Sequence, residues 1–286
     1  MRERAERILR AEPGYVPVAA RPASTMALLR DGRDGLEVFL MRRLRTLGFA
    51  PGMHVYPGGG VDPADSAVPV SPGTDLDAVA RLLSTNDPVG IVAAAVRETF
   101  EESGVLLAVD GDGAPVTLDE SWEEHRRAVT ARELSFAELL VSRGLSVHGE
   151  ALVPFAHWVT PETQQRRFDT RFVAARLPEG QEPSERGGES DVVRWWRPAD
   201  AVASFEAGET PMLAPTVDTL EILSAYASVD DALAGMRDLP VRPLMPRGTL
   251  DAATDEVTWM LVDERTGEVL RGGIEPPPSE VDGVHA

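Results

Sequence analysis

Three glutamates in the middle of the chain have the residue type and spacing of a metal site. Glu98, Glu101 and Glu102 stand at i, i+3 and i+4, so a helix places all three carboxylates on one face. Like charges at this spacing repel by roughly a few tenths of a kcal/mol per pair. A divalent cation such as Mg²⁺, which prefers oxygen ligands, would offset that repulsion. The alternative is a solvated acidic face on a surface helix.

The residues around these glutamates favour a function over a plain surface helix. Arg97 precedes Glu101 by four residues and can fix its carboxylate through a charge-assisted hydrogen bond. The segment 91–98 is rich in alanine and predicts a helix that ends at Gly104, after a break at 88–90. A glycine-rich turn at 57–60 lies upstream.

Composition and charge exclude several classes of protein. The chain has no cysteine, which rules out a disulfide framework, a thiolate metal site and a cysteine nucleophile. Its net charge is −19, which disfavours binding to nucleic acid or to an anionic membrane. All 28 basic residues are arginine, so a substrate phosphate must be bound by arginine, backbone N–H groups or a metal.

No sequence signal points to a membrane or to secretion. The N-terminus lacks an apolar stretch typical of a secretory signal, and no apolar run approaches the roughly 20 residues that span a bilayer. We therefore expect a cytoplasmic protein with a small-molecule partner. A homodimer stays an open alternative for its assembly.

Hydrophobic patterning predicts a mixture of strands and helices, typical of an α+β or α/β sandwich. A leader of 1–23 precedes the folded part, and a proline-rich tail ends the chain. Strands are expected at 25–29 and 36–41 (a hairpin), 54–56, 152–159, 171–177, 191–196 and in a terminal hairpin over 255–271; helices are expected within 62–90 and 118–144, from 198, and at 215–227.

The acidic helix resembles the second half of the Nudix box. That box reads Gly, five residues, Glu, seven residues, then Arg-Glu-apolar-x-Glu-Glu-x-Gly-apolar. Residues 97–105 match its second half, with Thr99 at a position that is usually aliphatic. Pro57-Gly58-Gly59 resembles the first half, but the spacing to Arg97 is too long by over fifteen residues. The position of the first box glutamate falls on Val89, so we expect that glutamate to be absent.

An insertion inside the box is typical of the coenzyme A diphosphatase-like branch of the Nudix hydrolases. The resemblance implies a Nudix α/β/α sandwich with a mixed sheet, helical insertions and a C-terminal extension. We expect the Nudix domain at 24–235, with insertions at 62–90 and 115–145, and the extension and tail at 236–286. Further similarity is carried by Gly48-Phe49-x-Pro51-Gly52-x-His54-Val55-x-Pro57-Gly58-Gly59, by Trp158-Val159-Thr160-Pro161, by 166–172 and by Pro215-Thr216.

The resemblance also implies a reaction and its ligands. Glu98, Glu101 and Glu102 would bind Mg²⁺ or Mn²⁺, with the Gly58 carbonyl as a further ligand, and Arg97 would complete the catalytic helix. The metal would assist substitution at phosphorus of a nucleoside diphosphate linked to another moiety. Coenzyme A or acyl-CoA is the preferred substrate, giving 3′,5′-ADP and a phosphopantetheine. The alternatives are an ADP-ribose, NADH or dinucleoside pyrophosphatase, and a ligand-binding Nudix domain without turnover.

Other polar residues are candidates for the rest of the site. Glu189 is the candidate general base; the alternative is an exposed acid in a loop. Arg167 and Arg171 could bind a pyrophosphate or a 3′-phosphate, or could pair with acids along a solvated strand edge. Arg43 could face a phosphate, and His54 could touch the substrate or hold the geometry of its loop.

Overall fold

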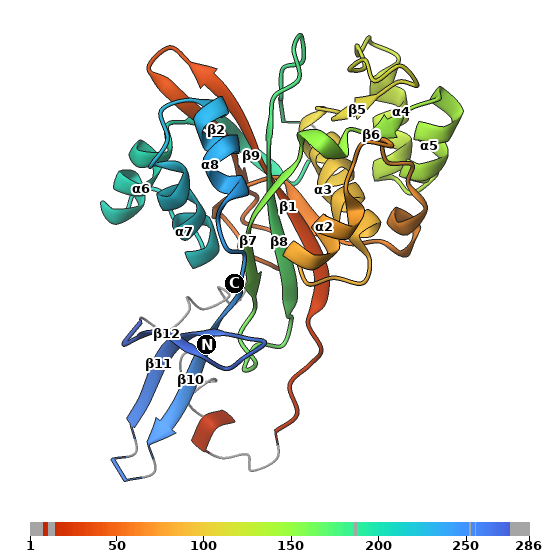
Figure 1. The fold of residues 1–286 in the computed structure, drawn as a ribbon. Helices are drawn as coiled ribbons and strands as arrows, with labels where there is room; N and C mark the ends of the chain where they lie inside the picture. The colour runs from red at the N-terminus through yellow and green to blue at the C-terminus, as the bar shows by residue number, and fades with distance from the viewer. Residues whose placement is uncertain (1–7, 11–14, 186–187, 252, 255, 275–286) are drawn as a thin grey trace.

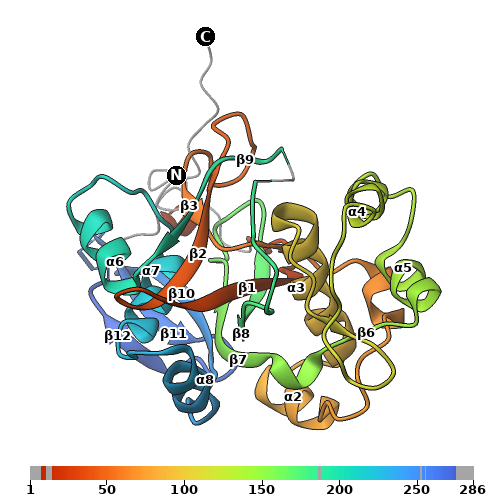
Figure 2. The same ribbon diagram turned by 90° about the horizontal axis from the view of Figure 1, so that it is seen from above.

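The computed structural model describes residues 8–10, 15–185, 188–251, 253–254 and 256–274. A mixed ten-stranded sheet lies between two groups of helices, as Figures 1 and 2 show from two directions. Its strands are β1 Arg21–Gly32, β2 Gly35–Arg43, β3 His54–Val55, β4 Gly58–Gly60, β7 Val153–Val159, β8 Phe168–Arg176, β9 Ser190–Trp196, β10 Pro243–Asp251, β11 Glu256–Asp263 and β12 Val269–Gly272. A small separate sheet pairs β5 Ala108–Val109 with β6 Ser146–Val147.

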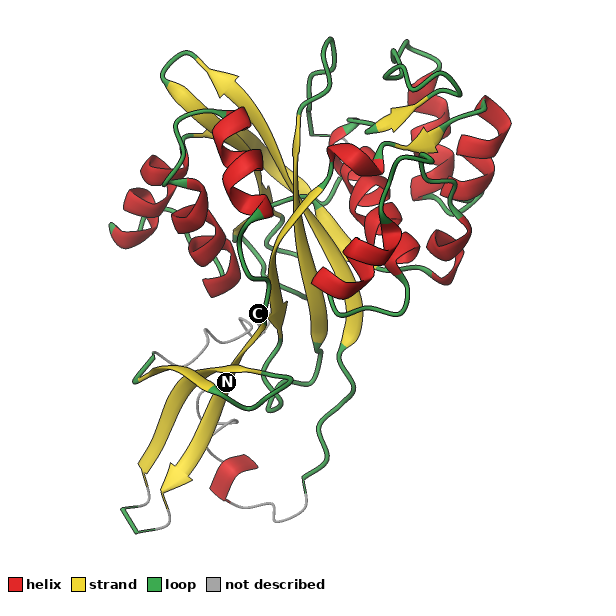
Figure 3. Cartoon of the chain, viewed as in Figure 1, coloured by secondary structure: helices red, strands yellow, loops and turns green. Residues whose placement is uncertain are grey.

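The helices divide between the two faces of the sheet (Figure 3). One group comprises the 3₁₀ helix η1 Pro63–Ala67, α2 Leu76–Leu82, α3 Pro88–Ser103, α4 Trp122–Thr130 and α5 Phe136–Arg143. The other comprises α6 Pro198–Glu206, α7 Ala214–Leu223 and α8 Val229–Arg237. A second 3₁₀ turn, η2 Gly149–Ala151, leads into β7. The predicted sandwich class is confirmed.

Alternating side chains of the central strands fill two cores. Met26 and Leu28 of β1 pack into the core under α3, α4 and α5, whereas Ala27 and Leu29 pack into the core under α6, α7 and α8. This alternation follows from the two-residue period of a strand that is covered on both faces. Each fully buried leucine contributes about 1.5–3 kcal/mol.

The order of the sheet is β12-β11-β10-β7-β8-β1-β2-β3, with β4 paired to β1 and β9 paired to β2. β1 runs parallel to β8, and β10 runs parallel to β7; the other pairs are antiparallel. β1 therefore lies between β8 on one side and the β2 hairpin and β4 on the other. This position brings the glycine strand β4 next to α3, which contacts both β1 and β4.

Most elements expected from the sequence are present, but several boundaries differ: β1 begins before the expected strand, α7 ends before residue 227, and α3 begins earlier than predicted. The predicted break at 88–90 is the first turn of α3: Asp87 caps the helix by accepting from Gly90 N at 2.8 Å, and Pro88 occupies the first turn. Proline suits this position because its missing N–H has no partner in the first turn. The elements that were not predicted include α8, the proline-containing strand β10 and the short strands β4, β5 and β6.

The C-terminal strands extend the sheet that carries the site. β10 pairs with β7 through Pro243 and Leu244, and β11 and β12 follow as an antiparallel hairpin. The predicted tail falls largely outside the described residues, as do residues 1–7 and 11–14 of the predicted leader. Within the described part of the chain, no helix has the length and apolar character needed to cross a membrane.

Candidate active site

The acidic helix α3 is fixed from behind by the core. Its residues 91–96 and Phe100 are buried, with at most 2% of each exposed, and Gly104 ends the helix in the left-handed region at φ 79°. Glycine adopts that conformation without the steric cost of a side chain. The three glutamates therefore sit on the last two turns of a helix that cannot move without disturbing the core.

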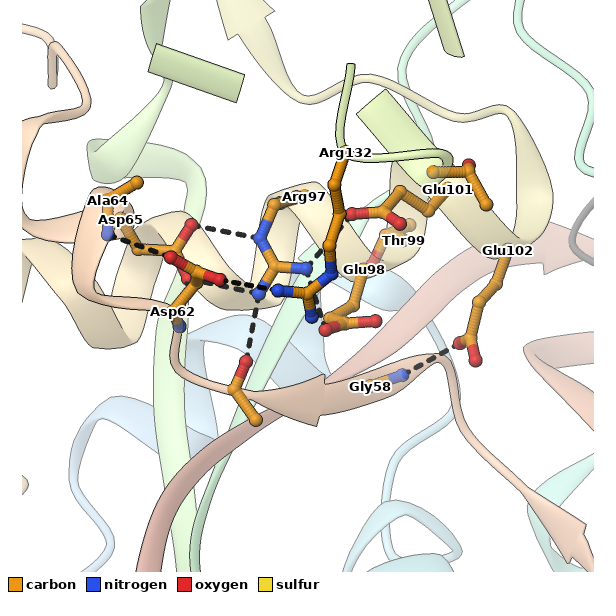
Figure 4. A network of polar contacts seen from close by, with 12 residues as sticks. Gly58, Asp62, Ala64, Asp65, Arg97, Glu98, Thr99, Glu101, Glu102 and Arg132 are labelled. Atoms are coloured by element: carbon orange, nitrogen blue, oxygen red, sulfur yellow. Dashed lines mark hydrogen bonds and ion pairs between the residues drawn. The ribbon is translucent and has the colours of Figure 1, made fainter. Parts of the chain in front are cut away.

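The glycine strand β4 lies between β1 and this helix, and Gly58 approaches the backbone of β1 more closely than a residue with a side chain could. A Cβ atom at Gly58 would stand 2.7 Å from Ser24 O and 2.8 Å from Thr25 Cα. A Cβ atom at Gly59 would collide with the Glu98 carboxylate. The backbone can thus reach the acids, and Gly58 N donates a hydrogen bond of 2.9 Å to Glu102 Oε2 (Figure 4).

Arg97 is the centre of the polar network. Its Nη1 donates to Glu98 Oε1 at 2.7 Å and to Glu101 Oε1 at 2.9 Å. Its Nε and Nη2 donate to the two carboxylate oxygens of Asp65 at 2.9 and 3.0 Å, and Nη2 also reaches Gly60 O at 2.8 Å. Burial alone would lower the pKa of Arg97, but Asp65 and Glu98 raise it above its ordinary value. The guanidinium therefore stays charged.

Asp65 is a functional residue that the sequence analysis missed. It is 1% exposed and lies in η1, inside the insertion of residues 62–90. It follows Gly59 by six residues, which is the spacing of Gly, five residues, Glu in the Nudix box. The glutamate is absent, as expected, but an aspartate stands at the position that this spacing gives for the first box acid. The inserted residues lie between Asp65 and Arg97, so counting backwards from Arg97 gave the wrong position.

Burial raises the pKa values of two acids in the cluster, Glu98 and Glu102. Desolvation raises the pKa of Glu98 to about 7, against the lowering effect of Arg97 and with a further increase from the charge of Glu101. Desolvation, followed by the charge of Glu98, raises the pKa of Glu102 well above its usual range. A cation beside these two carboxylates would stabilise their charged forms.

The oxygen donors fit a hard divalent cation, but they are not yet arranged as its complete ligand set. Among the described residues, no three acidic or histidine side chains converge as a group that could hold a metal. Figure 4 shows why: Arg97 bridges Glu98 and Glu101, while Glu102 turns toward the Gly58 N–H. The Glu98 and Glu102 carboxylates both lie beside β4, at Gly59 and Gly58 respectively.

A cavity of about 720 Å³ opens over these acids. Its polar part is lined by β4 and the acidic end of α3. Its apolar part is lined by side chains of the loop after β2 and of β7 and β8, including Phe49, Met53, Tyr56, Trp158, Phe168 and Phe172. Phe49 and Phe168 meet edge to face with ring centroids 5.4 Å apart. The cavity thus combines charged groups for a phosphorus centre with room for a larger apolar or aromatic moiety.

Two further predicted residues meet at the edge of the same cavity. Arg43 donates to Phe49 O at 3.1 Å and to Glu189 Oε2 at 3.2 Å. Both Arg43 and Glu189 line the cavity, and a smaller hollow behind it is bordered by these two residues and Glu102. The structure therefore brings Glu189 close to the acidic helix from a distant part of the chain.

Three of the predicted substrate-binding residues do not line this cavity. Arg167 is 8% exposed and donates to Thr160 O at 3.0 Å and to Val18 O at 2.8 Å. Arg171 is 5% exposed and forms an ion pair with Asp169 at 2.6 Å. Neither lines the cavity. Their donors stabilise backbone and acid groups inside the protein instead of facing a phosphate.

His54 is also absent from the cavity lining. It is 9% exposed, packs edge to face on Trp196, and burial lowers its pKa. Its backbone N–H donates to Pro211 O at 2.9 Å. The loop-geometry alternative for this histidine therefore fits better than substrate contact.

Comparison with known proteins agrees with this geometry. A model of the NUDT19 Nudix domain matches residues 79–223. A crystal structure of a Nudix hydrolase from Alicyclobacillus acidocaldarius is 30% identical, with a TM-score of 0.66 and coverage of 79% of this chain and 99% of that one. The acyl-coenzyme A diphosphatases NUDT19 of Xenopus laevis and Homo sapiens are 26% and 25% identical, over 78% and 84% of this chain and 68% and 79% of theirs.

The chain belongs to the NUDT19 Nudix domain family of Nudix pyrophosphohydrolases. The resemblance inferred from residues 97–105 is thereby confirmed. Nudix hydrolases generally use divalent metals such as Mg²⁺, which agrees with the donor chemistry of the acidic helix.

Replacing Asp65 tests the buried ion pair between Asp65 and Arg97, which we call the Asp65–Arg97 clamp. Asp65→Asn should lower the free energy of unfolding by about 3 kcal/mol, because Arg97 loses its buried charged partner. Urea unfolding measures this, with the exposed Asp112→Asn as a control expected to change stability by less than about 0.5 kcal/mol. Equal stability of the two variants would show that the clamp contributes nothing.

The raised pKa of Glu98 predicts a pH dependence of stability in metal-free protein. The folded protein keeps this proton up to about pH 7, whereas the unfolded chain releases it near pH 4.5. The folded state binds more protons in between, so the free energy of unfolding should fall as pH rises through that window. Glu98→Gln should flatten this decline in urea titrations with a chelator present. An unchanged slope would contradict the assignment.

Proposed function

We propose that the protein hydrolyses coenzyme A or acyl-CoA in a divalent-metal-dependent reaction, giving 3′,5′-ADP and a phosphopantetheine or its acyl derivative. The observation that carries this proposal is the cavity that joins the acidic end of α3 to an apolar region. A coenzyme A molecule has the matching parts, a diphosphate and a long, weakly polar arm. The relatives named acyl-coenzyme A diphosphatase support the substrate class.

We assign the metal to Glu98, Glu101 and Glu102, with the Gly58 carbonyl as a further ligand. When bound, Mg²⁺ or Mn²⁺ would polarise the phosphoryl oxygens and activate water. For Glu101 to bind the metal, its carboxylate must leave Arg97 Nη1, to which it now accepts at 2.9 Å. The cation would then replace the arginine as the partner of that carboxylate.

The chain's own groups do the remaining work in this proposal. Arg43 and Arg97 supply positive charge at the polar end of the cavity, and Glu189 is the candidate general base at its edge. Phe168 and Trp158 line the part that would hold the adenine or the pantetheine arm. These aromatic walls exclude water from one side of the phosphorus centre. A cytoplasmic location and a homodimer stay predictions.

A substrate panel tests the proposed substrate. With Mg²⁺, coenzyme A and acyl-CoA should be hydrolysed with a higher kcat/KM than ADP-ribose, NADH or a dinucleoside polyphosphate. Chromatography should identify 3′,5′-ADP as the nucleotide product from coenzyme A. A higher kcat/KM for ADP-ribose or NADH would replace the coenzyme A assignment with the alternative.

Glu102→Gln tests the assignment of the acids. The amide oxygen can still accept from Gly58 N, but the charge that would hold the metal is lost. Turnover should fall by about 100-fold or more, because the metal contributes several kcal/mol to the transition state. Folding should persist, because a buried charge has been removed. The exposed Glu124→Gln on α4 is the matched control, and equal activity of the two variants would overturn the ligand assignment.

A further inference from the structure

Few basic side chains line the cavity. The chain contains no lysine, and the arginines that line the cavity are Arg43, Arg97 and Arg132. Arg97 is committed to two oxygens of Asp65, to two glutamates and to a carbonyl. Arg43 is bound to a carbonyl and to Glu189. A substrate with several phosphate charges needs a cation whose donors are less occupied.

Arg132 has such donors. Its side chain is 82% exposed, and its Nη1 donates to Asp62 Oδ2 at 3.1 Å. Asp62 is its one side-chain partner within the described residues. Arg132 lies in the connection between α4 and α5, and its ion pair with Asp62 is drawn in Figure 4. It lines the same cavity as Arg97, Glu98 and Glu101.

The backbone at this position gives no reason for an arginine. Arg132 follows the end of α4 with φ 58°, and its N–H donates to Val129 O at 2.9 Å. Glycine is the residue that ends a helix in this conformation at the least cost. A side chain held in a sparsely populated backbone region is a frequent sign of function. Since the backbone does not favour arginine here, a function of this residue would lie in its guanidinium.

The partner of Arg132 can release it without losing its own role. Asp62 caps η1, where its Oδ1 accepts from Ala64 N at 2.9 Å, and this bond does not involve Arg132. The Arg132 side chain is largely exposed, so the ion pair is weak in water and exchanges readily. A phosphate would be a stronger partner, because a guanidinium can donate two parallel hydrogen bonds to it.

We propose that Arg132 is a substrate-binding residue that exchanges Asp62 for a phosphate group of the substrate. This inference rests on the proposed function. The phosphate group that Arg132 binds is either part of the diphosphate that is cleaved or a phosphomonoester on the ribose. The first setting affects every substrate, whereas the second affects only those that carry the additional phosphate.

Arg132→Gly separates the side chain from the backbone. Glycine keeps the left-handed turn, so the variant should be at least as stable as the wild type. Its KM for coenzyme A should rise about tenfold, the size of one lost charge-assisted hydrogen bond, with kcat changed by less than about twofold. An equal rise with dephospho-coenzyme A assigns the diphosphate, and a rise confined to coenzyme A assigns the phosphomonoester.

Two control variants exclude a general effect of charge and a structural role. Arg127→Ala removes a 73% exposed arginine that pairs with Glu123 on α4, and its KM should match that of the wild type. Asp62→Asn should leave KM unaltered or lower it, because Arg132 is released toward the substrate. An unchanged KM in Arg132→Gly, or an equal rise in Asp62→Asn, overturns the proposal.

A binding measurement keeps this test independent of turnover. Calorimetry on the metal-free protein should show tighter binding of adenosine 3′,5′-bisphosphate to the wild type than to Arg132→Gly. If coenzyme A is not hydrolysed but this difference is present, the proposed substrate fails while the phosphate role of Arg132 stands. Equal binding by both proteins, or no binding by the wild type, overturns the role of Arg132.

Discussion

The buried ion pair between Arg97 and Asp65 is the interaction on which the site depends. Both side chains are shielded from water, with 11% and 2% exposed, so their attraction is weakly screened. The pair joins the insertion of residues 62–90 to the catalytic helix and leaves the Nη1 of Arg97 to orient Glu98 and Glu101. The insertion is therefore part of the active site.

The glycine strand supplies the second constraint. Because Gly58 and Gly59 lack side chains, β4 can pair with β1 and still approach the acids of α3. The same close approach removes water from Glu98 and Glu102 and raises their pKa values. Packing in the two cores stabilises the fold and keeps the Glu98 and Glu102 carboxylates close together. A divalent cation would reduce the repulsion between them.

Local patterns in the sequence predicted the acidic helix, the first hairpin and the sandwich class, because each depends on short-range periodicity or turn chemistry. Long-range pairings were harder to foresee. Arg167 and Arg171 follow the alternation of a strand, but periodicity cannot show that their partners are backbone carbonyls inside the protein. Asp65 had a usable signal, its six-residue distance from Gly59, which the insertion concealed. Strand β10 was not predicted because it contains Pro243 and Pro246, and proline usually argues against a strand. The pairing of β10 with β7 is limited to Pro243 and Leu244.

We infer that the ion pair between Asp65 and Arg97 positions the glutamates for a divalent ion. The affinity of wild-type and Asp65→Asn protein for Mn²⁺, measured by electron paramagnetic resonance at a temperature where both are folded, tests it most directly. Without Asp65, Arg97 is free to bind the glutamates more closely and to compete with the ion. We expect Mn²⁺ to bind about 10–100-fold more weakly to the variant. Equal affinity in the two folded proteins would contradict it.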